Sequence, residues 1–434
     1  MPTVALHTLG CKLNHAETST IGRQFVDRGY SLVEFGRPAD VCVINTCTVT
    51  HRADRECRQM IRRALRISPA SYVIVTGCYA QLQPEEIASI AGVDLVLGTR
   101  EKFDVFTHAG DMDKRLTPRV VVSDIATGDD FGPASSAIPG EQTRAFLKVQ
   151  DGCDYSCSYC TIPLARGASR SLPVDECVRH ATELAAQGYR EVVLTGVNVG
   201  DYNGGDGRGL RQLLPALVAV PGIERWRISS IEPNLLTDDL LNFISTEPKM
   251  CPHVHIPLQS GDDHVLRLMR RRYSTADCVR LLEKVRTVMP HAGIGVDIIV
   301  GFPGETEACF AATHEFIAAL PVSYLHVFTY SERPNTPAAD YQDPVEPRVR
   351  FARSNALRIL SHMKRQAFMR AMVGTRQEVL VEQELHGPHR LGFTGNYIRT
   401  TIAADAAAGN TLLPVEISDV RGDVCFARPI TGDV

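Results

Sequence analysis

Cys153, Cys157 and Cys160 lie within the segment 153–160, whose sequence is CDYSCSYC. This CxxxCxxC spacing, with an aromatic residue directly before the third cysteine, can hold three irons of a 4Fe-4S cluster and leave the fourth iron open. An open iron can bind the amino and carboxylate groups of S-adenosylmethionine, and one electron then cleaves that cofactor to a deoxyadenosyl radical. A zinc site would need a fourth ligand, and neither a CxxC nor a HxxxH pair follows at zinc-finger spacing. The three cysteines are therefore predicted ligands of a radical-generating cluster.

Cys11, Cys47 and Cys78 form a second group, although they are far apart in the sequence. Each follows a short apolar run that is typical of a buried strand. The carboxyl ends of parallel strands share one edge of a sheet, so we expect the three thiols to lie close together. Three thiolates can hold another 4Fe-4S cluster with one open iron. The alternative is that small cysteines pack well where strands meet helices, which three equivalent placements make less attractive.

The other cysteines share no such placement and are predicted to be structural. They are Cys42, Cys57, Cys177, Cys251, Cys278, Cys309 and Cys425. With 434 residues, 44% of them hydrophobic, the chain is long enough for two or three domains. A formal charge of -4 excludes an overall basic field, so RNA would have to meet local patches. No long apolar run or leader-like start is present, and we expect a cytoplasmic protein without a membrane partner.

The first hundred residues alternate between apolar runs and helical stretches, which predicts a parallel sheet with crossover helices. The expected strands are 4–9, 41–44, 72–75 and 93–97, and the expected helices are 16–28, 54–67 and 84–90. Six further strand-helix units follow, with strands at 145–149, 192–195, 226–229, 254–256, 295–300 and 325–329. Six units do not close an eight-stranded barrel, so its open side could admit a macromolecular substrate.

Polar residues and a glycine stand at the ends of these later strands. Gly196 would let a backbone approach a cofactor closely, and Ser230, Glu232 and Gln259 offer hydrogen bonds. Asp297 lies within an apolar strand, where an unpaired carboxylate would be costly, so we expect it to face the barrel mouth and find a partner there. The alternative for each single residue is that it merely forms a turn.

Residues 150–163 resemble the cluster loop of the radical S-adenosylmethionine superfamily, and GCKLN at 10–14 with NTCTVT at 45–50 resembles the methylthiotransferase family, nearly from end to end. The second motif is most similar to the MtaB branch, which converts N6-threonylcarbamoyladenosine beside the tRNA anticodon to its 2-methylthio form. Two branches with the same layout stay open as alternatives: MiaB, acting on isopentenyladenosine in tRNA, and RimO, acting on an aspartate of a ribosomal protein.

The resemblance implies two 4Fe-4S clusters, with S-adenosylmethionine as radical source and as methyl donor. It implies tRNA, an electron donor such as flavodoxin or ferredoxin, and a sulfur source as partners; it leaves the oligomeric state open. The six cysteines of the two groups would be catalytic. The residues expected around S-adenosylmethionine are Tyr159, Gly196, Asn198, Ser230, Glu232, Gln259 and Asp297.

Basic residues gather at 52–66, 270–272 and 348–370, and could meet phosphates or simply form solvated faces. Segment 328–336 resembles the family's end-of-barrel motif, with Arg333 a candidate RNA contact and Asn335 in place of a usual glycine. From Gly374 on, short alternating runs at 378–382, 397–402, 415–417 and 424–427 predict a small barrel that resembles a TRAM domain. Phe393 and Tyr397 could stack on bases and Arg399 could meet phosphate. The acidic balance of this part favours packing against the rest of the chain as the alternative.

The predicted architecture is α/β in three parts. They are an N-terminal parallel α/β sheet domain at 1–125, a partial (β/α)6 barrel at 140–372 and a small antiparallel β-barrel at 373–434, with 107–142 as a connector. Two rival functions fit the sequence less well. A cobalamin-dependent radical methylase would usually carry an Asp-x-His-x-x-Gly motif, which is absent. A non-catalytic iron-sulfur RNA-binding protein would bind tRNA and make no deoxyadenosine.

Overall fold

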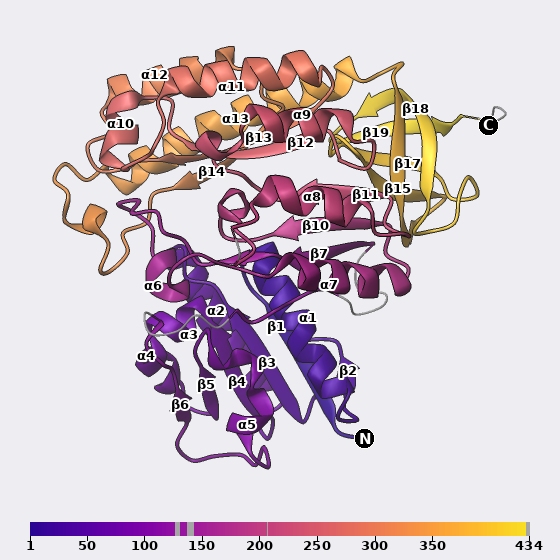
Figure 1. Ribbon diagram of the computed structural model, residues 1–434. Coiled ribbons are helices and arrows are strands. Elements are labelled where there is room, and N and C mark those ends of the chain that lie inside the picture. Colours follow the sequence, from indigo (N-terminus) through magenta and orange to yellow (C-terminus); the bar gives the residue numbers. More distant parts are fainter. Residues whose placement is uncertain (126–130, 137–142, 206, 431–434) are drawn as a thin grey trace.

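The computed structural model describes residues 1–125, 131–136, 143–205 and 207–430. It has a parallel sheet near the N-terminus, a partial barrel next to it and a closed five-stranded barrel at the C-terminal end (Figure 1). The fold class is therefore the predicted α/β arrangement. The predicted connector at 107–142 and the boundary at 140 fall partly outside the described residues.

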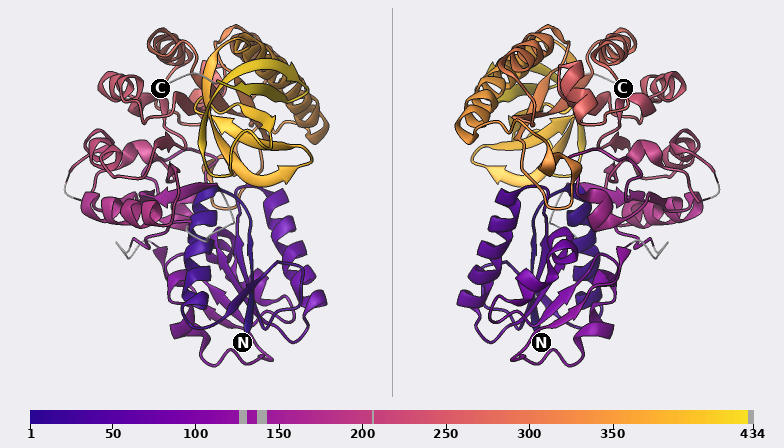
Figure 2. Two further views of the ribbon diagram at one scale, coloured as in Figure 1. Left: turned by 90° about the vertical axis from the view of Figure 1, so that its right-hand side faces the viewer. Right: turned by 90° about the vertical axis from the view of Figure 1, so that its left-hand side faces the viewer.

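The N-terminal sheet is parallel throughout, in the order β2-β1-β3-β4-β5-β6. Its strands are β1 (Thr3–Thr8), β2 (Ser31–Val33), β3 (Val41–Thr46), β4 (Tyr72–Gly77), β5 (Leu95–Leu97) and β6 (Arg119–Val121). Helices lie on both sides of it (Figure 2), namely α1 (Lys12–Val26), α2 (His51–Ile67), α3 (Cys78–Leu82), α4 (Pro84–Ala88) and α5 (Val105–Ala109). Strands β3 and β4 are buried along their whole length, which explains their continuous apolar runs.

The partial barrel consists of two parallel three-stranded sheets, β11-β10-β7 and β12-β13-β14. Its strands are β7 (Arg144–Lys148), β10 (Glu191–Thr195), β11 (Arg225–Ile228), β12 (His253–Gln259), β13 (Gly293–Val300) and β14 (Tyr324–Thr329). All six predicted strands are confirmed. In place of a full ladder, an isolated bridge between Trp226 and Met250 joins β11 to the segment that leads into β12.

Helices cover this barrel, and one buried apolar core, which includes Trp226, fills the space between helices and strands. The longer helices are α7 (Val174–Ala186), α8 (Leu210–Val218), α9 (Asp238–Thr246), α11 (Thr275–Val288), α12 (Glu307–Ala319) and α13 (Pro347–Ala371). Two short helices, α6 (Ile162–Arg166) and α10 (Asp263–Leu268), lie near the cysteine loop. A short antiparallel pair, β8 (Gln150–Asp151) and β9 (Arg170–Ser171), frames that loop. None of the described helices combines the length and apolarity that crossing a membrane requires.

The C-terminal barrel closes in the order β15-β16-β17-β19-β18. Its strands are β15 (Arg376–His386), β16 (His389–Thr394), β17 (Arg399–Ala403), β18 (Leu412–Arg421) and β19 (Val424–Pro429). Arginines at the start of β11 attach it to the partial barrel. Arg225 donates to the carbonyl oxygens of Glu378 and Phe393 at 3.0 and 3.1 Å, and Arg227 donates to that of Gly395 at 2.9 Å. The small barrel is thus fixed against the amino ends of the larger barrel's strands.

Candidate cluster sites and the side chains around them

Cys11, Cys47 and Cys78 converge at the carboxyl ends of three neighbouring strands, β1, β3 and β4. Cys11 caps α1, Cys47 follows β3 directly and Cys78 begins α3. Gly10 makes room for this convergence, because a Cβ there would lie 2.7 Å from the Cβ of Cys47. Burial, with the neighbouring Cys78 and Cys11 thiols, raises the pKa of Cys47 to about 12. The predicted convergence is found, and the role of these thiols as ligands stays a prediction.

Cys153, Cys157 and Cys160 lie on one tightly held loop. The amide of Cys153 donates to the carbonyl oxygen of Gly167 at 3.0 Å. The amide of Cys160 donates to the carbonyl oxygen of Cys157 at 3.2 Å. Ser158 anchors the loop to the turn after α10, because its hydroxyl donates to the carbonyl oxygen of Leu268 at 2.7 Å. Burial raises the pKa of Cys160 to about 12, with a further contribution from the two neighbouring thiols. This loop carries three sulfur donors, the number that a 4Fe-4S cluster with one open iron requires.

Arg271 is a contact of this loop that the sequence analysis did not single out. Its guanidinium donates to the Cys157 sulfur at 3.0 Å and forms an ion pair with Glu232. Its side chain is only 3% exposed and is therefore not available to a phosphate. This differs from the phosphate contact that the basic run 270–272 had indicated. Arg272 is exposed and lies over the ring of Tyr155, with its guanidinium carbon 3.7 Å from the ring centre. A hydrogen bond from a cation favours the thiolate that binds iron.

Of the predicted cofactor residues, Gly196 and Asn198 lie against the side chain of Gln150. A Cβ on Gly196 would lie 2.8 Å from the Gln150 side-chain oxygen, so this glycine is needed for packing within the protein. The same oxygen accepts from the Asn198 amide at 2.8 Å. The side-chain oxygen of Asn198 is buried and lacks a hydrogen-bond partner among the described residues. An orphaned acceptor at a strand end fits a cofactor with donor groups, such as the amine or ribose of S-adenosylmethionine.

The remaining predicted cofactor residues are also at the strand ends. Gln259 is the last residue of β12, buried and with a φ of 66°, and Ser230 is half-buried just after β11. Tyr159 lies in the cysteine loop, with its hydroxyl 3.4 Å from the guanidinium of Arg271. Glu232 is committed to Arg271, as described above. Ser230 and Gln259 therefore offer the freer polar groups.

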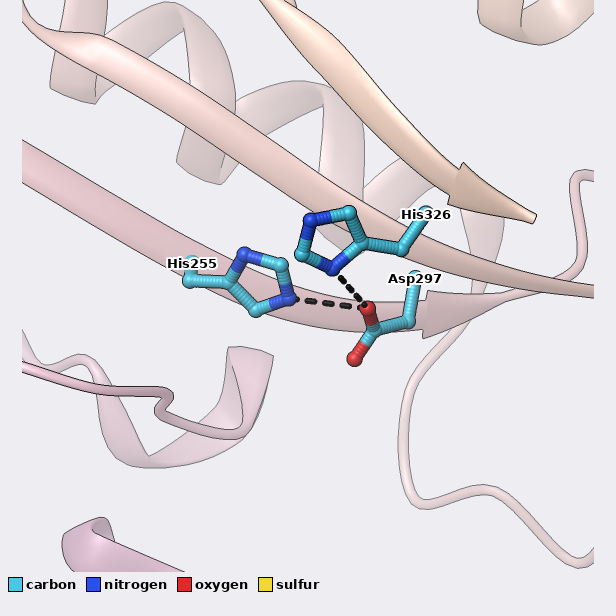
Figure 3. A group of neighbouring side chains, drawn as sticks. All are labelled: His255, Asp297 and His326. Carbon is cyan, nitrogen blue, oxygen red and sulfur yellow. Dashed lines mark hydrogen bonds and ion pairs between the residues drawn. The ribbon is translucent and has the colours of Figure 1, made fainter. Parts of the chain in front are cut away.

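Asp297 has the partners expected of a carboxylate in an apolar strand (Figure 3). His255 on β12 and His326 on β14 each form a hydrogen bond to its Oδ1, at 2.9 and 3.2 Å. Burial alone would raise the pKa of Asp297, but these two imidazoles hold it well below its usual range. The ligand atoms lie within 4.8 Å of one another, a spacing that could also hold a metal ion. Because they already bond to one another, the group is best described as a polar network on the inner face of the barrel.

A buried group of charges separates the two cysteine sites. The carboxylates are Glu17 and Asp151, and the fully buried cations are Lys102, Lys148 and Arg166. Burial alone would raise the pKa of Glu17, but Arg166, Lys102 and Lys148 hold it well below its usual range. Arg166 lies near Cys11 and Cys78 as well as beside the two carboxylates. A buried cation here fits thiolates that carry a metal cluster.

The predicted RNA contacts are mostly engaged within the protein. Arg333 is buried, with Asp54 Oδ2 at 2.7 Å and the Thr48 hydroxyl at 2.6 Å, which argues against a phosphate contact. Phe393 and Tyr397 stack on each other, with ring centres 4.9 Å apart. Arg399 pairs with Glu382 and lies over Phe393. Tyr397 also contacts His253 of the larger barrel, with ring centres 4.9 Å apart, as the alternative of packing against the rest of the chain expects.

Family comparisons divide the chain in the same way as its fold. Residues 3–98 match a family described as Uncharacterized protein family UPF0004, and residues 147–317 match the Radical SAM superfamily. The threonylcarbamoyladenosine tRNA methylthiotransferase MtaB of Bacillus subtilis (strain 168) is 40% identical over 92% of this chain and 90% of that protein. The protein of that name in Aquifex aeolicus (strain VF5) is 39% identical over 91% and 95%. A tRNA-2-methylthio-N(6)-dimethylallyladenosine synthase of Cereibacter sphaeroides is 34% identical over 92% and 96%.

Solved structures resemble the fold at low sequence identity. The radical S-adenosylmethionine methyltransferase TsrM of Kitasatospora setae, with tryptophan and a cofactor analogue bound, matches with a TM-score of 0.54. The identity is 14%, and the match covers 78% of this chain and 75% of that one. The cobalamin-dependent radical enzyme OxsB matches with a TM-score of 0.52 and 12% identity, over 82% of this chain and 55% of that one. These likenesses support the arrangement of a parallel α/β part beside a radical S-adenosylmethionine barrel.

Proposed function

Since this chain belongs to the methylthiotransferase family of radical S-adenosylmethionine enzymes, we propose that it converts N6-threonylcarbamoyladenosine of tRNA to the 2-methylthio derivative. The observation that carries the proposal is the similarity to proteins named for that reaction, at 34% to 40% identity over most of the chain. The two groups of three thiols are what this reaction needs, because it requires both a radical source and a sulfur donor.

The residues that would hold the cofactors follow from the two groups of thiols. Cys153, Cys157 and Cys160 would hold one 4Fe-4S cluster, and the N-terminal three would hold a second. With S-adenosylmethionine bound, the two clusters would provide the chemistry that removes a hydrogen from adenine C2 and attaches a methylated sulfur to that carbon. The buried guanidinium of Arg166 near Cys11 and Cys78 supports the second cluster, because it offsets negative charge on the ligating thiolates.

The chain's own side chains would bind and orient. We assign the orphaned Asn198 oxygen, the Ser230 hydroxyl and the Gln259 amide to the cofactor, because they are polar groups at the strand ends beside the cysteine loop. Arg271 donates a hydrogen bond to the Cys157 sulfur, and its ion pair with Glu232 leaves that carboxylate a weaker candidate for direct contact. Their common effect is to fix the cofactor before the substrate arrives.

The polar network at Asp297 favours the threonylcarbamoyl substrate over an apolar one. Asp297 is 23% exposed and His326 is 50% exposed, so both present polar atoms on the inner face of the barrel. A threonylcarbamoyl group carries a hydroxyl, an amide and a carboxylate that can bond to such atoms. A dimethylallyl group would desolvate these polar atoms without forming hydrogen bonds to them. The dimethylallyladenosine synthases among the relatives make that substrate the second candidate.

The remaining partners belong to the proposal as well. The reaction needs an electron donor, for which flavodoxin or ferredoxin is suitable, and a source of sulfur. The enzyme would meet tRNA in the cytoplasm, with the C-terminal barrel as a TRAM-like module. We place the domain boundaries at 1–125, 140–372 and 373–434.

Mass spectrometry of tRNA nucleosides tests this function directly. The gene is expressed in a host that lacks its own methylthiotransferases, with the Cys11→Ala, Cys47→Ala, Cys78→Ala variant as a control. The intact chain should yield 2-methylthio-N6-threonylcarbamoyladenosine, and the variant should yield none while still cleaving S-adenosylmethionine. The isopentenyl derivative in its place would establish the second candidate. Absence of both, with intact clusters, would direct attention to a ribosomal-protein substrate.

A further inference from the structure

Arg166 lies at the junction between the two cysteine sites. It is the last residue of α6, which follows the cysteine loop of the partial barrel. Its side chain is 1% exposed and reaches across to α1 of the N-terminal part. An arginine buried to this degree is retained only when hydrogen bonds satisfy its guanidinium, and here they come from both parts of the molecule.

On the N-terminal side, Arg166 holds the side chain of Asn14. Its Nη2 donates to Asn14 Oδ1 at 2.7 Å. The Nδ2 of Asn14 in turn donates to the carbonyl oxygens of Leu9 at 2.8 Å and Thr46 at 3.1 Å. Leu9 and Thr46 belong to the two junctions that carry Cys11 and Cys47. Because Arg166 can only donate, it fixes which end of the Asn14 amide faces those carbonyls.

On the barrel side, Arg166 holds the residues that lead into the cysteine loop. Its Nη1 donates to Asp151 Oδ1 at 2.9 Å, and the same nitrogen also donates to Glu17 Oε1, on α1 of the N-terminal part, at 3.0 Å. The same Asp151 oxygen accepts from the amide of Gly152 at 2.9 Å, directly before Cys153. One guanidinium therefore touches the supports of both groups of thiols.

We propose that Arg166 is a positioning residue that sets the N-terminal thiols in place relative to the radical-generating loop. This inference rests on the proposed function, in which a hydrogen leaves and a sulfur arrives at the same carbon. The two sites must then be held at a fixed separation, because a misplaced sulfur leaves the substrate radical without its partner. A planar guanidinium can hold Asn14, Glu17 and Asp151 together, whereas a lysine offers a single point of donation.

Arg166→Lys is the informative variant, because it keeps the positive charge and loses the planar guanidinium with its several N–H donors. The measurement is the ratio of deoxyadenosine formed to methylthio nucleoside formed, with tRNA and reductant present. We expect this ratio to rise about tenfold or more, because a displacement near 1 Å is enough to impair such a reaction. Arg166→Gln should raise it further. Arg170→Gln is the matched control. The Arg170 guanidinium lies 3.7 Å from Asp151 and donates to the carbonyl oxygens of Arg166 and Ala168. Among the described residues, it forms no hydrogen bond or ion pair with α1. Its ratio should stay at the wild-type value.

An equal fall of both products in Arg166→Lys would overturn the inference, because that is the result of a general loss of folded enzyme. A second measurement covers variants with little activity. In a Cys153→Ala, Cys157→Ala, Cys160→Ala background, the electron paramagnetic resonance spectrum of the reduced N-terminal cluster should change on Arg166→Lys and not on Arg170→Gln. An unchanged spectrum in both would contradict the positioning role. If the wild type made no methylthio nucleoside, the proposed function would fail while this spectroscopic result could still stand.

Discussion

At the scale of single residues, the sites have to overcome a cost of burial. A thiol binds iron as the thiolate, yet burial raises the pKa of Cys47 and Cys160 to about 12. Cations close to each group of thiols reduce this cost: Arg271 donates to Cys157, and Arg166 lies near Cys11 and Cys78. Each site thus carries the charge that favours metal over protons.

Arg271→Met tests this reading at the cysteine loop. Loss of a cationic donor to the Cys157 sulfur destabilises the more negative, reduced cluster, so its midpoint potential should fall. Arg272→Met is the control, because it removes the same charge from the neighbouring residue. The Arg272 side chain is exposed and lies over the ring of Tyr155. Anaerobic redox titration followed by electron paramagnetic resonance measures both. Equal potentials in the two variants would mean that Arg271 contributes bulk charge only.

The cysteines were predictable from the sequence because their spacing and strand-end placement repeat a pattern. The arginines were not. Arg271 stands in a run of three arginines that indicates a charged surface, and its burial depends on how α10 packs against the loop. Arg166 has no distinguishing neighbour in the sequence, and its partners Asn14 and Glu17 are remote along the chain. Side chains that act across parts of a molecule leave little local signal.

At the scale of elements, the junctions between strand and helix carry the N-terminal site. Strands β3 and β4 were predictable because both of their faces are buried and their sequences are mostly apolar. Strand β2, at Ser31–Val33, was missed because it is short and half-buried. Strand β16 was missed as well, since its Gly392 and charged residues do not alternate in the expected way. The pattern of apolar residues in a sequence reflects burial. Strands at a sheet edge, or with a mixture of buried and exposed residues, have too little burial to produce a clear pattern.

Gly10→Ala tests the junction itself. Gly10 has a φ of 100°, and a new Cβ would lie 2.7 Å from the Cβ of Cys47 and 2.9 Å from its sulfur. The methyl group should push Cys47 out of place, so iron content should fall from about eight to about four atoms per chain if both clusters were present before. Gly29→Ala serves for comparison: its φ is 82° with nothing within 4 Å, so it shares the backbone strain without the clash. Full iron content in Gly10→Ala would show that the site tolerates the shift.

At the scale of the whole molecule, buried arginines join the parts. Arg166 connects the N-terminal sheet to the barrel at the cysteine loop, and Arg333 connects them again at the end of β14. Arg225 and Arg227 connect the larger barrel to the smaller one. Arg333, in the segment that resembles the family's end-of-barrel motif, was predicted to contact RNA; its burial follows from the docking of one part on another. Relative placement of parts is thus where the sequence is least informative.

A double-mutant cycle on Arg333 and Asp54 tests whether these parts unfold together. The pair is 4% and 9% exposed, and Thr48 donates to the second Asp54 oxygen at 2.6 Å, so each charge depends on the other. Arg333→Met or Asp54→Leu alone should cost about 3 kcal/mol of unfolding free energy, because each strands one buried charge, and the double variant should cost less than their sum. The exposed pair Arg37 and Glu34, 3.7 Å apart, should give single changes within about 0.5 kcal/mol. Simple additivity at Arg333 and Asp54, measured by chemical denaturation, would mean that neither charge depends on the other and that this pair does little to join the two parts.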